Sequence, residues 1–418
     1  MRQGGHVSRM TGRGVQRRIL SYKRGYCLPM RAAVASGLTL LLAALVLGAI
    51  CGTVRAEEKY PHHPVNLSFF YPISTNQNPE ISTSFRLNLL YGELGDIRGV
   101  DLTGIGSHTF RDVVGLQVCG FYSHIEGGLR GVSVVGATNY VKSNAAGFQY
   151  ACLVNFIRGD FTGFQMSNLF NYVEGSMSGM QANLVFNLND GDVKYFQYST
   201  IANAVAGNVT GIQLATGLNY ANGRVVGGQV ALCNFGKHVR GIQIGLGNVA
   251  ETVKGVQLGF VNVAREVDGI PLGMFNFVEE GDQDWVIFGS NISAASTGVR
   301  SIYHDFYSVL AVGVGDLQEK RHDTAFLSWH YGYAIPIASR FKIGADLGYL
   351  HIMPASNSDP DVDTRNQFAL QLRVIGEIKV MGKTKIFAGA GGSTRFSAYS
   401  MDNTSTTDPL FVVGVSLY

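Results

Sequence analysis

Residues 241–250 read GIQIGLGNVA, and residues 255–264 read GVQLGFVNVA. This pattern recurs in twelve units along the chain, each opening on an anchor residue that is Gly in all but one of them. Nine anchors recur at every sixteenth position and three more follow at every fourteenth: Gly99, Gly115, Gly131, Gly147, Gly163, Gly179, Tyr195, Gly211, Gly227, Gly241, Gly255 and Gly269. Self-similarity at a fixed period indicates an array architecture.

Two polar positions recur inside the units. Gln lies two residues after the anchor in nine units, at 117, 149, 165, 181, 197, 213, 229, 243 and 257. Asn lies seven or eight residues after it, at 139, 155, 171, 187, 203, 219, 234, 248, 262 and 276. Around both positions side chains alternate with a period of two, which is typical of strands. In the stretch from the anchor to the Asn position, across all twelve units, the only charged residue is Asp101. Turn sequences such as Asn222-Gly223 separate the units.

Two architectures fit these repeats. In a β-solenoid each unit is one coil, with a strand at Gln, a corner, a strand at Asn and a second corner. In an antiparallel barrel meander each unit is one membrane strand. The shorter units lack one position between Gln and Asn and another between Asn and the next Gly. A corner absorbs such a deletion, whereas a continuous strand would turn every later side chain to its other face. The sequence therefore favours the solenoid and keeps the meander as an alternative.

The amides have a different role in each architecture. In a solenoid, identical Gln and Asn side chains stack coil on coil and form hydrogen-bonded ladders. In a barrel they would line the lumen and offer uncharged contacts to solutes. The solenoid makes the Gln and Asn series structural, and the barrel makes it part of a transport path.

The regions flanking the repeats are also predicted to be β-structure. Residues 57–96 contain two candidate strands, Val65 to Ile73 and Ser84 to Leu94, before the repeat region at 97–282. Residues 283–418 resemble an outer-membrane β-barrel, because apolar and polar side chains alternate over the length of a membrane strand. The clearest example has Phe368, Leu370, Leu372, Val374, Ile378 and Val380 on one face and Gln371, Arg373, Glu377 and Lys379 on the other. Further strands are expected at Phe306 to Val314, Ala325 to Ile335, Phe341 to Leu350, Lys385 to Phe396 and Leu410 to Tyr418. The predicted fold is all-β.

Residues 1–56 have the composition of a secretory signal. They hold nine Lys or Arg and no Asp or Glu, and an apolar run extends from Ala32 to Ile50. A start at Met30 would give a signal of ordinary size; an uncleaved anchor is the alternative. The remaining chain carries 24 basic and 30 acidic residues. This balance argues against a nucleic-acid partner. Three cysteines remain, Cys119, Cys152 and Cys233, and their spacing requires no disulfide.

The repeat units resemble those of a bacterial surface-repeat family with tandem G-V-Q-[IL]-G-L-V-N-V-A units after a signal peptide. The similarity rests on residues 241–250 and 255–264, on Ser68-Phe-Phe-Tyr-Pro-Ile and on Leu87-Asn-Leu-Leu-Tyr-Gly, and it covers roughly residues 65 to 310. Tyr418 is similar to the closing aromatic residue of outer-membrane barrels, although Phe411, Val413, Val415 and Leu417 occupy the other face. The resemblance implies an envelope surface protein and implies no defined biochemical activity.

The sequence contains no catalytic, cofactor-binding or metal-binding motif: G-x-S-x-G, H-E-x-x-H, C-x-x-C and the P-loop are absent. The pair His62-His63 could hold a metal ion but is expected to be solvated. Arg158-Gly159-Asp160 matches an adhesion tripeptide, and it also occupies a turn position. Arg373, Glu377 and Lys379 are expected to line a polar or salt-bridged barrel interior. Seven aromatic residues are expected at a membrane interface: Trp285, Trp329, Tyr303, Tyr307, Tyr331, Tyr333 and Tyr349.

These observations predict an exported, non-enzymatic protein of the bacterial outer membrane or cell surface, structural or adhesive in role. Its expected partners are outer-membrane lipid and other envelope or extracellular proteins, with no cofactor. A porin-like channel is one alternative and requires the repeats to be barrel strands. A secreted, soluble β-solenoid binding protein is the other.

Overall fold

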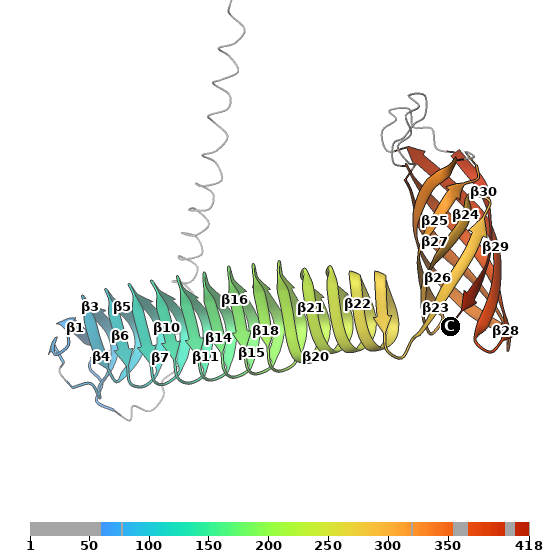
Figure 1. Cartoon of the computed structure of the whole chain (residues 1–418). Helices are drawn as coiled ribbons and strands as arrows, with labels where there is room; N and C mark the ends of the chain where they lie inside the picture. The colour runs from blue at the N-terminus through green and yellow to red at the C-terminus, as the bar shows by residue number, and fades with distance from the viewer. Residues whose placement is uncertain (1–59, 77, 319–320, 354–366, 398–405, 418) are drawn as a thin grey trace, which may run out of the picture. The chain divides into compact units, whose positions relative to one another are not determined.

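The computed structural model describes residues 60–76, 78–318, 321–353, 367–397 and 406–417. The expected signal segment and Tyr418 lie outside the described residues. The chain divides into two compact units, Met1–Val135 and Gly136–Tyr418, and all of its named elements are strands (Figure 1). No helix in the described part of the chain is long and apolar enough to cross a bilayer.

The first unit consists of parallel β-coils, apart from β2, which pairs antiparallel with β1. Its strands are β1 (Val65–Phe70), β2 (Ile73–Ser74), β3 (Ser82–Asn88), β4 (Tyr91–Leu94), β5 (Asp96–Thr103), β6 (Gly106–Thr109), β7 (Val113–Cys119), β8 (Tyr122–Ile125) and β9 (Leu129–Val135). One parallel ladder joins β1, β3, β5, β7 and β9, and a second joins β4, β6 and β8. The expected strand Val65 to Ile73 is wrong beyond Phe70, because Ile73 lies in β2, which pairs antiparallel with β1. The expected strand Ser84 to Leu94 is divided between β3 and β4, and both parts join the parallel ladders.

The second unit begins with coils of the same kind. Their strands are β10 (Thr138–Val141), β11 (Ala145–Ala151), β12 (Val154–Ile157), β13 (Phe161–Ser167), β14 (Phe170–Val173), β15 (Met177–Asn183), β16 (Phe186–Asn189), β17 (Val193–Ser199), β18 (Ala202–Val205), β19 (Val209–Ala215), β20 (Leu218–Val230), β21 (Cys233–Ile244) and β22 (Gly247–Val278). Gln149 pairs in parallel with Gln165, and Asn155 pairs with Asn171. This register confirms the predicted β-solenoid, of about twelve turns over residues 65–258. The barrel meander is wrong because successive units run parallel.

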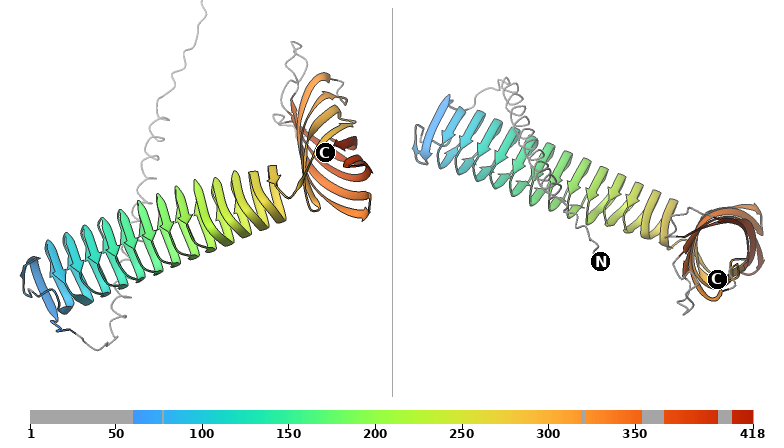
Figure 2. Two further views of the ribbon diagram at one scale, coloured as in Figure 1. Left: turned by 60° about the horizontal axis from the view of Figure 1, so that its bottom comes forward. Right: turned by 90° about the horizontal axis from the view of Figure 1, so that it is seen from above.

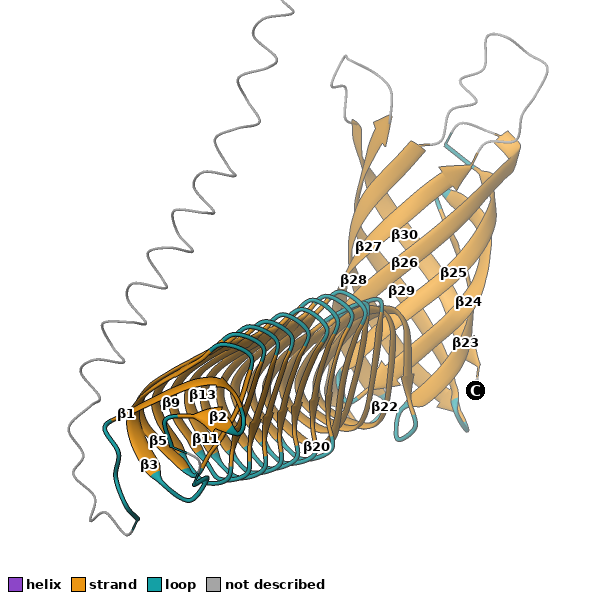
Figure 3. Cartoon of the chain, turned by 90° about the vertical axis from the view of Figure 1, so that its left-hand side faces the viewer, coloured by secondary structure: helices purple, strands orange, loops and turns teal. Residues whose placement is uncertain are grey.

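The corners absorb the change in repeat length, as predicted. Asn219 pairs with Asn234 and Gly227 pairs with Gly241, so one residue has been removed on each side of the Asn strand. The register shifts between Ala221 and Arg224, at a corner, and the strands on either side keep their faces. The loops of successive coils remain in line along the corners (Figure 3).

Two amide ladders fill the interior of the coils in the second unit. Each Gln donates from Nε2 to Oε1 of the Gln in the preceding coil, at 2.8–3.2 Å from Gln165 to Gln257. Each Asn donates from Nδ2 to Oδ1 of the Asn in the following coil, at 2.8–3.1 Å from Asn155 to Asn262. Most of these Asn amides also donate to a backbone carbonyl, as Asn155 does to Met166 at 2.7 Å. The series is therefore structural, because buried amides need such partners.

The anchor column requires glycine for a steric reason. Gly163 has φ +132°, and a Cβ there would lie 2.1 Å from the carbonyl oxygen of Gly147 in the preceding coil. Tyr195 is the exception in this column, since it adopts φ 89° while its side chain is exposed. A non-glycine residue held at such a φ costs about 1–3 kcal/mol.

Tyr195→Gly is therefore expected to be more stable than Tyr195→Ala by about 1 kcal/mol, because only the alanine retains the steric conflict of a Cβ at positive φ. The measurement is hydrogen–deuterium exchange of the backbone amides of residues 193–215 in the full chain. The matched control is Tyr198, on the same strand and outside the positive-φ positions of the described chain. There Ala should be the more stable replacement, since Gly costs about 0.5–1 kcal/mol in a strand. The same order at both positions would contradict the strain at Tyr195.

Eight strands of the second unit form a closed barrel. They are β23 (Asp282–Ser290), β24 (Ser293–Tyr303), β25 (Phe306–Asp316), β26 (Arg321–Ala338), β27 (Phe341–Met353), β28 (Gln367–Met381), β29 (Thr384–Ser397) and β30 (Thr406–Leu417). Each pairs antiparallel with the next, and β30 pairs with β23 to close the ring seen in the right-hand view of Figure 2. The predicted barrel is confirmed, with β23 and β24 as strands that the sequence analysis missed.

Candidate functional site

The outer face of the barrel is apolar. On β28, Leu370, Leu372 and Val374 are 46–61% exposed. The same alternation places large apolar side chains outward on the other strands except β24, among them Trp285, Ile287, Val312, Val314, Tyr333, Ile335, Ile343, Leu347, Ile386, Phe411 and Val413. The outer face of seven of the eight strands therefore exposes large apolar side chains, whereas contiguous apolar patches on monomeric soluble proteins rarely exceed a few hundred Å².

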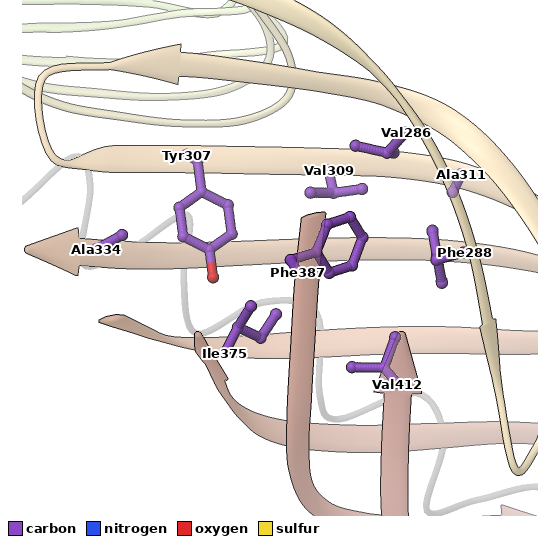
Figure 4. Close-up of a cluster of buried hydrophobic side chains, with 9 residues drawn as sticks. All are labelled: Val286, Phe288, Tyr307, Val309, Ala311, Ala334, Ile375, Phe387 and Val412. Carbon is purple, nitrogen blue, oxygen red and sulfur yellow. The ribbon is translucent and has the colours of Figure 1, made fainter. Parts of the chain in front are cut away.

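The inner face of the barrel combines an apolar cluster with buried ion pairs. The cluster consists of Val286, Phe288, Tyr307, Val309, Ala311, Ala334, Ile375, Phe387 and Val412 (Figure 4). Arg373 donates from Nε to Asp346 at 2.8 Å, and Arg300 pairs with Glu377. Lys385 Nζ lies 2.7 Å from Asp284 Oδ2. These side chains occupy the interior with one another, so the described residues form a packed barrel core.

The sequence prediction for the barrel interior is correct at two of three positions. Arg373 and Glu377 are buried and ion-paired, as expected of a salt-bridged core. Lys379 is on the same face of β28 as Arg373 and Glu377, but it lies near the end of the strand and its side chain is exposed. Its assignment to the interior was therefore wrong.

The aromatic residues divide between the two faces of the barrel. Trp285, Tyr333 and Tyr349 point outward and are exposed, and Trp329 and Tyr331 are half-buried. Their predicted position at a membrane interface stays a prediction. The prediction that Tyr307 is interfacial is wrong, because Tyr307 lies inside the barrel and its hydroxyl donates to Asp346 at 2.8 Å. The prediction for Tyr303 is wrong as well, because this side chain is buried and its hydroxyl donates to the carbonyl of Pro271 at 3.1 Å.

One corner of the solenoid carries the charged turns. Asp160 Oδ1 accepts a hydrogen bond from Ser176 N at 2.7 Å, and Asp160 N donates to Asn144 Oδ1 at 2.8 Å. Asp192 and Asn208 repeat this contact further along the second unit. The aspartate of Arg158-Gly159-Asp160 is therefore one step of a structural side-chain ladder, which favours the turn over the receptor interpretation.

The opposite corner of the solenoid carries an exposed apolar ridge. In the second unit this ridge consists of Leu153, Leu169, Ile201, Leu232, Leu246 and Phe260, which are 42–62% exposed. Backbone hydrogen bonds join ridge positions in successive coils, as from Leu246 N to Leu232 O at 2.8 Å. Beside the ridge, Tyr140, Phe156 and Tyr172 stack with ring centroids 4.7–5.0 Å apart. The column is interrupted at Gly217, between Ile201 and Leu232. Exposed apolar side chains that gather in this way are typical of interaction sites.

A buried ion pair lies at the start of the first unit. Arg86 and Asp101 are 1% and 0% exposed, and Arg86 donates from Nε and Nη2 to the two carboxylate oxygens at 2.7 and 2.6 Å. Gln117 and Thr103 also donate to Asp101, each at 3.0 Å. Burial alone would raise the pKa of Asp101, but the Arg86 guanidinium and these hydrogen bonds hold it below its ordinary value.

Two histidine arrangements in the first unit differ from the sequence predictions. His62, expected to be solvated, is hydrogen-bonded to Ser82 Oγ at 2.9 Å and to Ser84 Oγ at 3.2 Å. His108, His124 and Glu126 form a cluster that the sequence analysis missed. Their ligand atoms lie within 4.8 Å of one another. The available sign was the separation of the two histidines by one full period of the longer repeat, which places them in one column of a solenoid.

Cys119, Cys152 and Cys233 are free in the structure. Comparisons with known proteins add no further residues: no family model matches the chain, and no curated protein or solved structure matches it.

Proposed function

We propose that this protein is a non-enzymatic component of the bacterial outer membrane, anchored by the barrel of residues 282–417 and presenting its β-solenoid as a structural or adhesive surface. The observation that carries this proposal is the polarity of the barrel: apolar outside, with ion pairs inside. This arrangement is typical of outer-membrane barrels. The apolar exterior is suited to lipid hydrocarbon, and outer-membrane lipid is the proposed partner.

Strand length agrees with this location. A tilted membrane strand needs about 9–11 residues, and β23 to β30 have 9 to 18. Closure of the barrel between β23 and β30 removes the free edges that lipid cannot hydrogen-bond. The basic and apolar leader in residues 1–56 supports export to the envelope.

The solenoid supports the structural or adhesive part of the proposal. Its buried amides are engaged with one another and with backbone carbonyls, so they are not available to a substrate. The apolar ridge and its flanking aromatic stacks are available instead, and an envelope or extracellular protein is the partner we propose for them. The porin-like channel required the repeats to be barrel strands. It is not proposed, because the repeats are solenoid coils and the barrel interior is packed.

Cell fractionation with electrophoresis of unheated samples tests the proposal. We expect the protein in the outer-membrane fraction, with a change in gel mobility on heating, because folded outer-membrane barrels resist detergent until heated. Recovery as a soluble periplasmic or secreted protein without a mobility change would overturn the anchor and favour the soluble β-solenoid alternative. Protease treatment of intact cells then determines whether the solenoid is displayed on the surface.

A further inference from the structure

The geometry points to a Zn²⁺ site on the outer face of the first unit, formed by His108, His124 and Glu126. His108 Nε2 lies 3.3 Å from Glu126 Oε1, and His124 Nε2 lies 4.0 Å from the same oxygen. Zn²⁺ binds His nitrogen and carboxylate oxygen at about 2.0–2.2 Å, so tetrahedral ligand atoms lie about 3.3–3.5 Å apart. One of the three separations already has this length.

The solenoid register brings the two imidazoles together. His108 on β6 pairs directly with His124 on β8, and the two ring centroids lie 4.9 Å apart. Glu126 follows β8 immediately. Its backbone N–H donates to Thr109 O at 2.9 Å, and this hydrogen bond holds the Glu126 backbone beside the histidines. The three side chains come from two consecutive coils, so a bound ion would link those coils.

Neighbouring side chains orient the histidines as a metal site requires. The Tyr122 hydroxyl lies 2.9 Å from His124 Nδ1, so that Nε2 is the ring nitrogen directed to the cluster. A metal-binding His usually places its second ring nitrogen in a hydrogen bond of this kind. The His108 ring packs against Phe110 with centroids 4.4 Å apart. These contacts leave His124 Nε2 facing the cluster and pack His108 beside it before any ion binds. Zn²⁺ binding at Nε2 requires the tautomer in which Nδ1–H donates to the Tyr122 hydroxyl.

The ligand chemistry selects the ion. Two imidazole nitrogens and one carboxylate suit Zn²⁺, whereas Ca²⁺ and Mg²⁺ prefer sets made of oxygens. The side chains of His108, His124 and Glu126 are 19%, 23% and 36% exposed. Solvent can therefore deliver the ion, and its binding would require small side-chain rotations that shorten the separations now longer than about 3.5 Å. Three protein ligands leave the fourth position of a tetrahedral site to water.

Isothermal titration calorimetry of the purified full-length protein with Zn²⁺ tests the site. We expect one equivalent of Zn²⁺ to bind to this site, with no comparable binding of Ca²⁺ or Mg²⁺. Zn²⁺ should also slow hydrogen–deuterium exchange of residues 106–126, because binding to the folded state alone stabilises it. Wild-type protein that neither binds Zn²⁺ nor gains protection there would overturn the assignment, whatever the variants show.

Matched substitutions locate the bound ion. His108→Gln and His124→Gln should each abolish binding of the one equivalent of Zn²⁺. Tyr122→Phe should lower the Zn²⁺ affinity about 10-fold or more, as the loss of a hydrogen-bond partner of a metal ligand does. The control is His238→Gln, a histidine on the solenoid surface that bonds Thr252 and lies outside the cluster. Circular dichroism checks that each variant is folded. Unchanged affinity in folded His108→Gln, or equal loss in His238→Gln, would place the ion elsewhere and contradict the site.

Discussion

Asp101→Asn is expected to lower the stability of the first unit by about 3–5 kcal/mol, the cost of leaving one member of a buried ion pair without its counter-charge. Arg86 would keep its charge at 1% exposure and lose the carboxylate that accepts two of its hydrogen bonds. Hydrogen–deuterium exchange of residues 82–119 measures this loss locally, and urea unfolding followed by circular dichroism measures it globally.

The matched control is the same substitution in an exposed pair. Lys254 and Asp268 lie 3.6 Å apart, with side chains 66% and 69% exposed, so Asp268→Asn should cost less than about 1 kcal/mol. The double variant Arg86→Gln with Asp101→Gln should recover most of the stability, because it removes both charges and continues the Gln column. Equal effects of Asp101→Asn and Asp268→Asn would contradict the importance assigned to the buried pair.

The ion pair of Arg86 and Asp101 also predicts that the stability of the first unit depends on pH. The pKa of Asp101 is lower in the folded protein than its ordinary value of about 3.9. Its contribution to stability is therefore complete above that value and is lost as the pH falls through the folded pKa. Wild-type protein should lose more stability than Asp101→Asn between neutral pH and pH 3. Parallel stability curves for the two proteins would show that Asp101 does not titrate in this way.

Leu372→Arg is expected to destabilise the lipid-embedded barrel by about 2–4 kcal/mol, the cost of a basic side chain near the bilayer midplane. Leu372 is 61% exposed near the middle of β28. In water, a charge at so exposed a position would have an effect within about 0.5 kcal/mol. The measurement is urea unfolding of the protein in phospholipid vesicles, followed by tryptophan fluorescence, since both tryptophans are in the barrel strands β23 and β26.

Val380→Arg provides the control, because Val380 is on the same face of the same strand, is 54% exposed and lies near the strand end. Near the interface a basic residue costs about 0–1 kcal/mol. Similar, small effects at both positions would contradict a membrane location, since only a bilayer distinguishes them by depth.

The columns of the solenoid could be predicted from sequence because the repeat places identical side chains above one another. Gln149 and Gln165, or Asn155 and Asn171, differ by one period and are therefore neighbours in space. The shortening of the repeat near the end of the array also identified the corners, since only a corner tolerates the loss of one position. The expected strand faces of β28 were correct for the same reason: alternation fixes which side chains share a face.

The remaining features depend on contacts that the repeat does not encode. The partner of Asp101 is Arg86, which precedes the first anchor and was outside the repeat pattern. Strand β23 was missed because Trp285 and Ile287 outside and Val286 and Phe288 inside are all apolar, so no alternation of polarity marks it. The role of Tyr307 depends on which barrel face carries Asp346, and this follows only from the strand pairing.

Quenching of tryptophan fluorescence by brominated phospholipids tests the membrane location of the barrel most directly. Trp285 points outward and is 60% exposed on the apolar face, and the chain needs no added probe. In vesicles of lipids brominated on their acyl chains, we expect blue-shifted emission that is strongly quenched relative to the same vesicles without bromine. Emission that is red-shifted, as for tryptophan in water, and equal in both kinds of vesicle would contradict the proposed outer-membrane anchor.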